Sequence, residues 1–300
     1  MVRTSVVIPT RRGTDPLKAC LRALARTFPH DAETLVVCDG GPADLESTLT
    51  EFREPLKLRC IQAEHGGPSA ARNRGLAEAR GSIVAFTDDD CRPRDGWLTA
   101  LCDAVSLSPP RAAGGTTVNG LASNRYSDAA QVVIDLVARH DRVAFGGDRF
   151  FPTNNCAFPI APLRGVGGFD ESFRTAEDRE LFRRWRAAGF ALSRTPAAVV
   201  DHDAGTDLSG FVRKFFAYGR GAARFHAAGG EGSLRDSAAF HMYLPRLVGA
   251  EMKRRGTLGA VSLAGLLAVW EVANLAGFLV ESASGQTGSP VNGRRTGHAR

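Results

Sequence analysis

Short runs of apolar and β-branched residues recur along the first part of the chain, at residues 5–8, 34–37, 56–61 and 82–87. Segments with helical periodicity separate them, at about residues 16–27, 43–53 and 69–80. This alternation predicts an α/β fold with a mostly parallel, doubly wound sheet flanked by helices. Ligands bind such sheets beyond the carboxyl ends of the strands, so the residues that follow each run are the first candidates for a site.

The pattern changes near residue 112 and predicts a second lobe. Gly114-Gly115 and a polar stretch at 119–128 precede a helical run at 129–139, and a glycine-rich turn at 165–168 precedes a helix at 176–188. A strand-like run at 197–201 closes this part, and helices follow it. We therefore predict lobes over residues 1–118 and 119–205, a helical C-terminal extension over 206–284 and a disordered tail over 285–300.

A mostly apolar segment at residues 258–280 follows three basic residues at 253–255. Glu271 and Asn274 interrupt it, whereas a membrane-spanning helix needs about 20 consecutive apolar residues. A carboxylate near the middle of a bilayer costs a few kcal/mol. We therefore predict a packed or interfacial helix, with peripheral membrane contact through residues 253–280.

Composition narrows the classes of function. With 300 residues, 43% hydrophobic and 23% charged, the chain can bury a large core, which excludes disorder of the whole. The net charge of +6 is scattered among 32 acids, which favours attraction to phosphates or an anionic surface over nucleic-acid binding. Six cysteines without a C-x-x-C pair predict free thiols. No signal peptide is visible, so we expect a cytoplasmic protein, peripheral at the inner membrane face.

Three consecutive acids, Asp88, Asp89 and Asp90, follow the fourth apolar run. They repel each other unless a cation or hydrogen-bond donors compensate. In an extended chain Asp88 and Asp90 point to the same side, as a pair of hard oxygen ligands for Mn²⁺ or Mg²⁺ that would bridge to a diphosphate. An acidic turn that caps the next segment is the alternative, but the buried strand before the acids favours the metal site.

These acids belong to a series of segments that resembles family 2 glycosyltransferases with the GT-A fold. The segments are SVVIPT (5–10), VVCDGG (36–41), SAARNRG (69–75), GSIVAFTDDD (81–90), GGFD (167–170) and ED (177–178). The similarity spans about residues 4–205, and several ordered motifs are far more specific than any one of them. It implies a metal-dependent, inverting enzyme that moves a sugar from a nucleoside-diphosphate sugar to an acceptor hydroxyl.

The resemblance also assigns residues to the nucleotide. It implies that Pro9, Thr10, Arg11 and Asp39 hold the base and ribose, and a carboxylate at Asp39 can accept a hydrogen bond from the N3–H of uracil or thymine. A UDP- or dTDP-sugar is therefore favoured. Cys38 and Gly41 depart from the family, which usually has an acid and a serine there.

Further contacts to the diphosphate are expected from Asp88, Asp89 and Arg72. Arg72 lies near a helix start that follows Gly66-Gly67-Pro68-Ser69, where backbone N–H groups and a guanidinium can both face an anion. An exposed arginine on the helix surface is the alternative. Some relatives use a histidine at the place of His202 as a further metal ligand beside the Asp-x-Asp acids; Asp201 and Asp203 could orient its ring.

The Glu-Asp motif supplies the catalytic residues of the resemblance. It implies that Asp178 removes the acceptor proton, with Glu177 as its companion, and the positive end of the helix would keep Asp178 ionised at neutral pH. Thr175 and Asp178 also have the form of a capping box, which would explain Asp178 structurally. The Gln-x-x-Arg-Trp segment of processive members is missing near 211–221, so we expect single transfers, with Arg213 or Arg220 as phosphate contacts.

Two rival functions remain. A sugar-phosphate nucleotidyltransferase would need a glycine-rich, lysine-containing loop after the first strand, which Thr10-Arg11-Arg12-Gly13 does not supply. A non-catalytic nucleotide-binding module would bind without turnover. We expect the choice of base, sugar and acceptor to depend on the shape of the pocket in the region 119–159. Asn154 and Asn155 there are candidate acceptor contacts, although asparagine pairs are equally common in turns.

Overall fold

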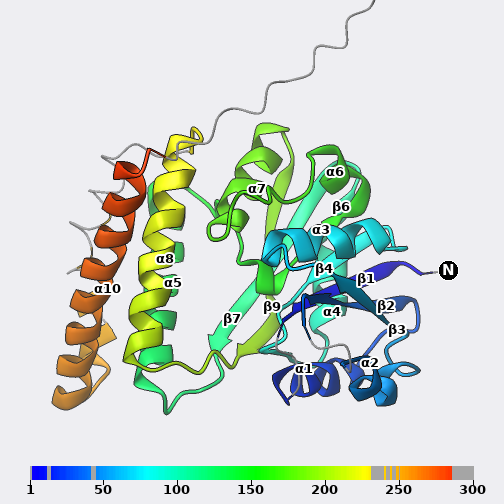
Figure 1. Ribbon diagram of the computed structural model, residues 1–300, viewed down its shortest axis with the longest axis horizontal. Helices are drawn as coiled ribbons and strands as arrows, with labels where there is room; N and C mark the ends of the chain where they lie inside the picture. The colour runs from blue at the N-terminus through cyan, green and yellow to red at the C-terminus, as the bar shows by residue number, and fades with distance from the viewer. Residues whose placement is uncertain are drawn as a thin grey trace, which may run out of the picture.

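The structure, a computed structural model, describes residues 2–11, 15–41, 45–230, 240, 244, 248–249 and 251–285 (Figure 1). Its strands are β1 (Thr4–Thr10), β2 (Ala32–Asp39), β3 (Leu58–Ala63), β4 (Ile83–Phe86), β5 (Cys91–Pro93), β6 (Ser106–Leu107), β7 (Pro110–Asn119), β8 (Cys156–Pro159) and β9 (Ala191–His202). Its helices are α1 (Asp15–Ala25), α2 (Leu45–Thr48), α3 (Pro68–Glu78), α4 (Trp97–Ala104), α5 (Arg125–Phe145), α6 (Ile160–Gly165), α7 (Glu177–Ala187), α8 (Leu208–Ala227) and α10 (Thr257–Ala283), with short 3₁₀ helices at Thr50–Phe52 and Thr153–Asn155. The predicted disordered tail lies, from residue 286, outside the described residues.

The described strands form one sheet, in the order β3-β2-β1-β4-β8-β7-β9-β5, with β6 paired to β7. The first four strands are parallel, as predicted. Because the chain goes from β1 to β2 and β3 on one side and returns to β4 on the other, a topological switch point lies between β1 and β4. Ligand sites form at such points, beyond the carboxyl ends of the strands.

Successive side chains of the central strands point to opposite faces of the sheet and pack into two hydrophobic cores, one on each face. Val6, Ile8 and Val36 face α1 and α4, whereas Val7 and Val37 face the layer that contains α3, α6 and α7. The central strands β1, β2 and β4 are thus buried on both faces, which is why they read as largely apolar runs. The α/β fold with flanking helices is confirmed. The six cysteines are unpaired and five of them are buried, which matches the prediction of free thiols.

The second half of the sheet is more extensive than the sequence predicted. Strands β8, β5 and β6 join by antiparallel pairing, and β9 begins at Ala191, well before the predicted run at 197–201. The proposed lobe boundary near residue 118 falls at the end of β7, which pairs with β8 and β9 in the same sheet. The predicted helix at 43–53 is instead α2 and a 3₁₀ turn.

Helices α5, α8 and α10 form a separate layer beside the sheet (Figure 1). Helices α8 and α10 approach closely because Gly219 and Gly277 lack side chains; an added Cβ would lie 1.9 Å from the Asn274 carbonyl oxygen and 2.0 Å from that of Phe216, respectively. Glu281, 4% exposed, accepts hydrogen bonds from Arg220 and Arg224. Within the described residues, α10 alone is long and apolar enough to span a membrane. One of its faces packs on the protein, as predicted.

Candidate active site

The three acids after β4 take three different partners. Asp88 accepts a hydrogen bond from Arg72 at 2.8 Å, Asp89 accepts one from Thr10 at 2.6 Å, and Asp90 lies 3.4 Å from Nε2 of His202. The three acids lie in the turn between β4 and β5 and not in the extended conformation that we expected. The extended geometry that was to point the carboxylates of Asp88 and Asp90 to the same side is therefore not formed. The turn sits at the switch point, where the site was predicted.

The best-formed group of metal-ligating atoms in the described residues is Asp90, Cys91 and His202. Cys91 pairs with His202 across β5 and β9, which brings the imidazole to Asp90. Burial opposes ionisation of Asp90, yet the His202 hydrogen bond holds its pKa below the ordinary value. Burial raises the pKa of the Cys91 thiol well above its usual range, and a protonated thiol is a poor ligand for a hard cation. The ligand atoms of Asp90 and His202 are therefore suited to a divalent cation, whereas the Cys91 thiol is not. Asp201 and Asp203, expected to orient His202, instead pair with Arg94 and Arg92.

Arg72 joins the Asp-x-Asp segment to the Glu-Asp motif. Its guanidinium donates to Asp88 and, at 3.0 Å, to Glu177, and it lies over the ring of Phe169. The Arg72 side chain is only 4% exposed, so the alternative of an exposed helix-surface arginine is wrong. Burial raises the pKa of Glu177 to about 7, and the charges of Asp178 and Asp88 add to this while Arg72 opposes it.

The capping box predicted at the start of α7 is not formed. Ala176 is the cap residue, in a left-handed conformation with φ of 64°, and it supplies no side-chain hydrogen bond. The Thr175 hydroxyl donates to the Ala217 carbonyl of α8, and Asp178 accepts from the backbone N–H of Arg179. Desolvation raises the pKa of Asp178, opposite to the direction expected from the helix end alone.

The nucleotide residues of the resemblance lie at the ends of β1 and β2. Thr10 is buried, Pro9 is half-buried and Arg11 is exposed. Asp39, 6% exposed, accepts from the backbone N–H groups of Gly66 and Gly67 and pairs with Nδ1 of His65. Although burial acts in the other direction, these hydrogen bonds lower the pKa of Asp39, so its carboxylate is ionised and orients the turn before α3.

The model of glycosyl transferase family 2 matches residues 5–164, which hold Thr10, Asp39, Arg72 and the three acids. The chain belongs to glycosyltransferase family 2. Pre-mycofactocin glycosyltransferase of Mycobacterium tuberculosis is 33% identical over 73% of this chain, and the match spans 46% of that protein's length. Glycosyltransferase AglE of Haloferax volcanii is 25% identical over 72% of each chain.

Solved structures confirm the GT-A-like fold of this family 2 glycosyltransferase. Mannosyltransferase PcManGT of Pyrobaculum calidifontis, in complex with GDP-Man and Mn²⁺, matches 94% of this chain and 86% of its own, with a TM-score of 0.63 and 18% identity. TarS 1-349 of S. aureus, in complex with UDP-GlcNAc, matches 94% and 91%, with a TM-score of 0.53 and 14% identity.

Several other predicted contacts of the family 2 enzyme have structural partners instead. Asn155 is 1% exposed; it accepts from Trp97 Nε1 and donates to the Ala198 carbonyl, so it holds the sheet together. Asn154, also buried, accepts from Thr117. Arg213 donates to Ser209, and Arg220 pairs with Glu281. These contacts give the four residues structural roles, and the acceptor and phosphate roles that the sequence suggested for them stay predictions.

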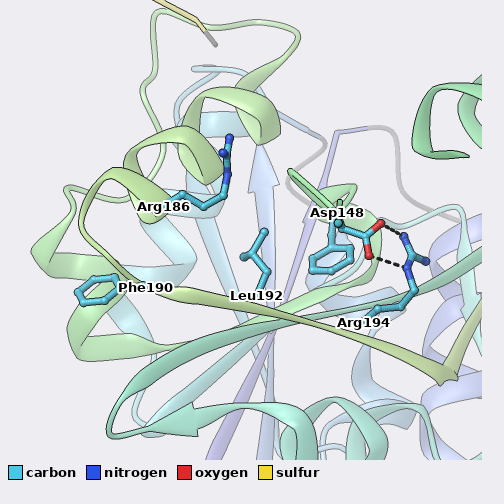
Figure 2. Close-up of a pocket in the computed structure, with 7 residues that line it drawn as sticks. Asp148, Arg186, Phe190, Leu192 and Arg194 are labelled. Atoms are coloured by element: carbon cyan, nitrogen blue, oxygen red, sulfur yellow. Dashed lines mark hydrogen bonds and ion pairs between the residues drawn. The ribbon is translucent and has the colours of Figure 1, made fainter. Parts of the chain in front are cut away.

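A cavity of about 280 Å³ lies at the other end of β9 (Figure 2). Arg194 and Asp148 form an ion pair at its wall, and Leu192 and Phe190 supply apolar lining. Leu192 is ten residues from His202 in the same strand, roughly 30 Å away. The predicted site residues do not line this cavity. We therefore assign the candidate active site to the switch point.

Proposed function

We propose that this chain is a metal-dependent, inverting glycosyltransferase that transfers a sugar from a nucleoside-diphosphate sugar to an acceptor hydroxyl, one sugar at a time. The observation that carries the proposal is the convergence of Asp90 with His202, and of Asp88 with Glu177 through Arg72, at the switch point of the sheet. The names of the relatives and the nucleotide sugars bound to the structural neighbours support it.

The metal would be held by Asp90 and His202, whose ligand atoms are 3.4 Å apart. When bound, Mn²⁺ or Mg²⁺ would neutralise charge on the departing diphosphate and act as a Lewis acid. Asp88 is held by Arg72 and Asp89 by Thr10, so these two acids would shape the site around the diphosphate. Burial, with the charges of Asp90 and Asp88, raises the pKa of Asp89 to about 6 against the Thr10 hydrogen bond.

Asp178 is the proposed general base. Its carboxylate takes the proton from the acceptor hydroxyl as that oxygen attacks the anomeric carbon, and the bond from that carbon to the diphosphate oxygen breaks. A single displacement of this kind inverts the anomeric configuration. The raised pKa makes the Asp178 carboxylate a stronger base than an ordinary aspartate. Glu177, fixed by Arg72, sets the start of α7.

Residues 1–118 would bind the nucleotide sugar and residues 119–205 the acceptor. Pro9, Thr10, Arg11 and Asp39 would hold the nucleoside. Asp39 has three hydrogen-bond donors on its two oxygens, which leaves acceptor capacity for the N3–H of uracil or thymine. A UDP- or dTDP-sugar therefore stays our proposed donor.

Peripheral membrane contact would run through residues 253–280. Large apolar side chains lie on the outer face of α10 at helical spacing: Leu258, Val261, Val272, Leu275 and Leu279, each more than half exposed. Lys253 and Arg254, also exposed, precede the helix and would meet anionic headgroups. Because the inner face packs along the charged helix α8, an in-plane position fits better than a spanning one. The cytoplasmic location stays a prediction.

A panel of nucleotide sugars tests the proposed function. Each is incubated with and without Mn²⁺, and binding, free nucleoside diphosphate and free sugar are measured. We expect divalent-dependent binding of one donor class and slow release of nucleoside diphosphate by transfer to water. In a parallel incubation with added pyrophosphate, formation of nucleoside triphosphate and sugar 1-phosphate would indicate a nucleotidyltransferase instead. Tight binding without turnover would indicate a non-catalytic module.

A further inference from the structure

Lys214 on α8 is a half-buried cation without an acidic partner. Among the described residues it forms no hydrogen bond or ion pair. It makes a cation–π contact with Tyr218, with Nζ 5.7 Å from the centroid of the ring. Other basic residues of the same helix are paired: Arg213 with Ser209, and Arg220 and Arg224 with Glu281. Lys214 is therefore distinguished from its neighbours by its environment.

The face of α8 that carries Lys214 is docked against the Glu-Asp motif. Residues 214, 217, 218 and 221 share one face at helical spacing. The Thr175 hydroxyl donates to the Ala217 carbonyl at 2.9 Å, and Gly221 packs so tightly on Thr175 that an added Cβ would lie 2.3 Å from its Oγ1. Thr175 is two residues before Glu177, so Lys214 and Tyr218 border the candidate active site.

The charges that influence the side chains of Lys214 and Tyr218 are acids of the candidate active site. Burial lowers the pKa of Lys214, and the charge that opposes this shift is Asp90. Although Tyr218 is 40% exposed, desolvation at its inner edge raises the pKa of Tyr218, and the charges of Asp178, Glu177 and Asp88 reinforce this shift. Within the described structure the Tyr218 hydroxyl has no hydrogen-bond partner, so a hydroxyl donor and a cation lie next to each other on the face of α8 that contacts Thr175.

A partly desolvated ammonium without an ion-pair partner costs the fold free energy, and the charge of Asp90, which forms no ion pair with Lys214, offsets only part of this cost. An anion that arrives with the substrate would supply the missing partner. The donor of the proposed reaction brings such an anion, and its diphosphate is the group that the Asp90–His202 site would also bind. We propose that Lys214, with the Tyr218 hydroxyl beside it, binds the diphosphate of the sugar nucleotide from the α8 side. The inference rests on the proposed function.

The test compares Lys214→Met with Arg74→Met, which removes a surface positive charge that is 54% exposed and paired with Glu78. UDP, GDP, dTDP and the corresponding nucleosides are titrated calorimetrically in Mn²⁺. We expect Lys214→Met to weaken diphosphate binding roughly tenfold to hundredfold and nucleoside binding less than about twofold, because a charge-assisted contact to phosphate is lost. Arg74→Met should stay within about twofold of wild type in both, as the loss of an exposed charge contributes little. Lys214→Arg should retain most of the diphosphate affinity.

A thermal melt separates binding from folding. Because Lys214→Met removes a desolvated charge, the variant should melt at or above the wild-type temperature. Unchanged diphosphate affinity, or an equal loss for nucleoside and diphosphate, would overturn the assignment of Lys214 and leave the proposed function standing. A wild-type protein that binds no nucleotide would overturn both.

Discussion

Replacement of Arg72 by methionine should destabilise the protein in a pH-dependent way. The guanidinium is buried and joins Asp88 and Glu177, whose side chains are 30% and 14% exposed. Removing one partner of a buried ion pair costs about 3–5 kcal/mol because it leaves the other charge unpaired. Partial exposure of Asp88 and protonation of Glu177 reduce this loss, so we expect about 2–4 kcal/mol at pH 8.

The sign of the pH dependence follows from Glu177. Its folded pKa of about 7 lies above the ordinary 4.5, so its contribution to stability is complete below the unfolded pKa and is lost as pH rises through the folded one. Without Arg72 the folded pKa rises further. When the pH is lowered from 8 to 6, Glu177 takes up a proton in the folded protein, and this raises the free energy of unfolding. Because the folded pKa of Glu177 is higher in the variant, this gain should be larger in the variant than in wild type, by about 1 kcal/mol.

Urea denaturation at pH 6, 7 and 8 measures both effects. Arg74→Met is the matched control on the same helix, because Arg74 is 54% exposed and pairs with Glu78 only at the surface, so a loss within about 0.5 kcal/mol is expected. The double variant Arg72→Met/Glu177→Gln should recover part of the loss. A single variant as stable as Arg74→Met at all three pH values would refute the role of Arg72 as the link between the two motifs.

Two further predictions concern the metal and the membrane. Asp90→Ala should abolish the Mn²⁺-dependent part of nucleotide binding, because the site loses its oxygen ligand. The control Asp95→Ala, at an exposed ion pair, should leave this binding unchanged. Calorimetry with and without Mn²⁺ measures both variants, and retained metal dependence in Asp90→Ala would exclude Asp90 as a ligand. Val272→Glu/Leu275→Glu, at positions 71% and 57% exposed, should weaken co-sedimentation with anionic vesicles roughly tenfold or more without lowering the melting temperature. Unchanged, salt-insensitive vesicle binding would show that this face of α10 does not meet lipid.

The first four strands of the sheet could be predicted from the sequence, because they appear in it as short apolar runs. Strands β1, β2 and β4 are buried on both faces and therefore read as apolar runs, whereas the edge strand β3 is only partly buried. Thr10, Asp39 and the three acids lie at or just after the carboxyl ends of β1, β2 and β4. Strand β7 escaped prediction because Gly114 and Gly115 resemble a turn. In the structure an added Cβ at Gly114 would lie 1.9 Å from the Phe151 ring, and one at Gly115 would lie 2.1 Å from the Ala198 carbonyl oxygen. These glycines permit close packing within the sheet.

The local sequence pattern could not predict residues whose surroundings depend on contacts between segments far apart in the chain. The spacing of Thr175 and Asp178 indicates a cap, but Thr175 bonds to α8 and Ala176 takes the left-handed conformation. Lys214 is on the face of α8 that borders the candidate site only because α8 docks on Thr175 and α10, and neither contact has a local signature. Arg72 likewise is paired across 105 residues of chain to Glu177.

The most direct test of the account is the turnover of Asp178→Asn. This variant keeps the size of the side chain and the oxygen that accepts from the Arg179 N–H, but it cannot take a proton. Transfer to acceptor is measured at saturating donor, together with a thermal melt and a nucleotide titration. We predict a fall in transfer of roughly two to four orders of magnitude with nucleotide and Mn²⁺ binding intact, as loss of a general base requires. Near-wild-type turnover by the folded variant would contradict the proposed mechanism.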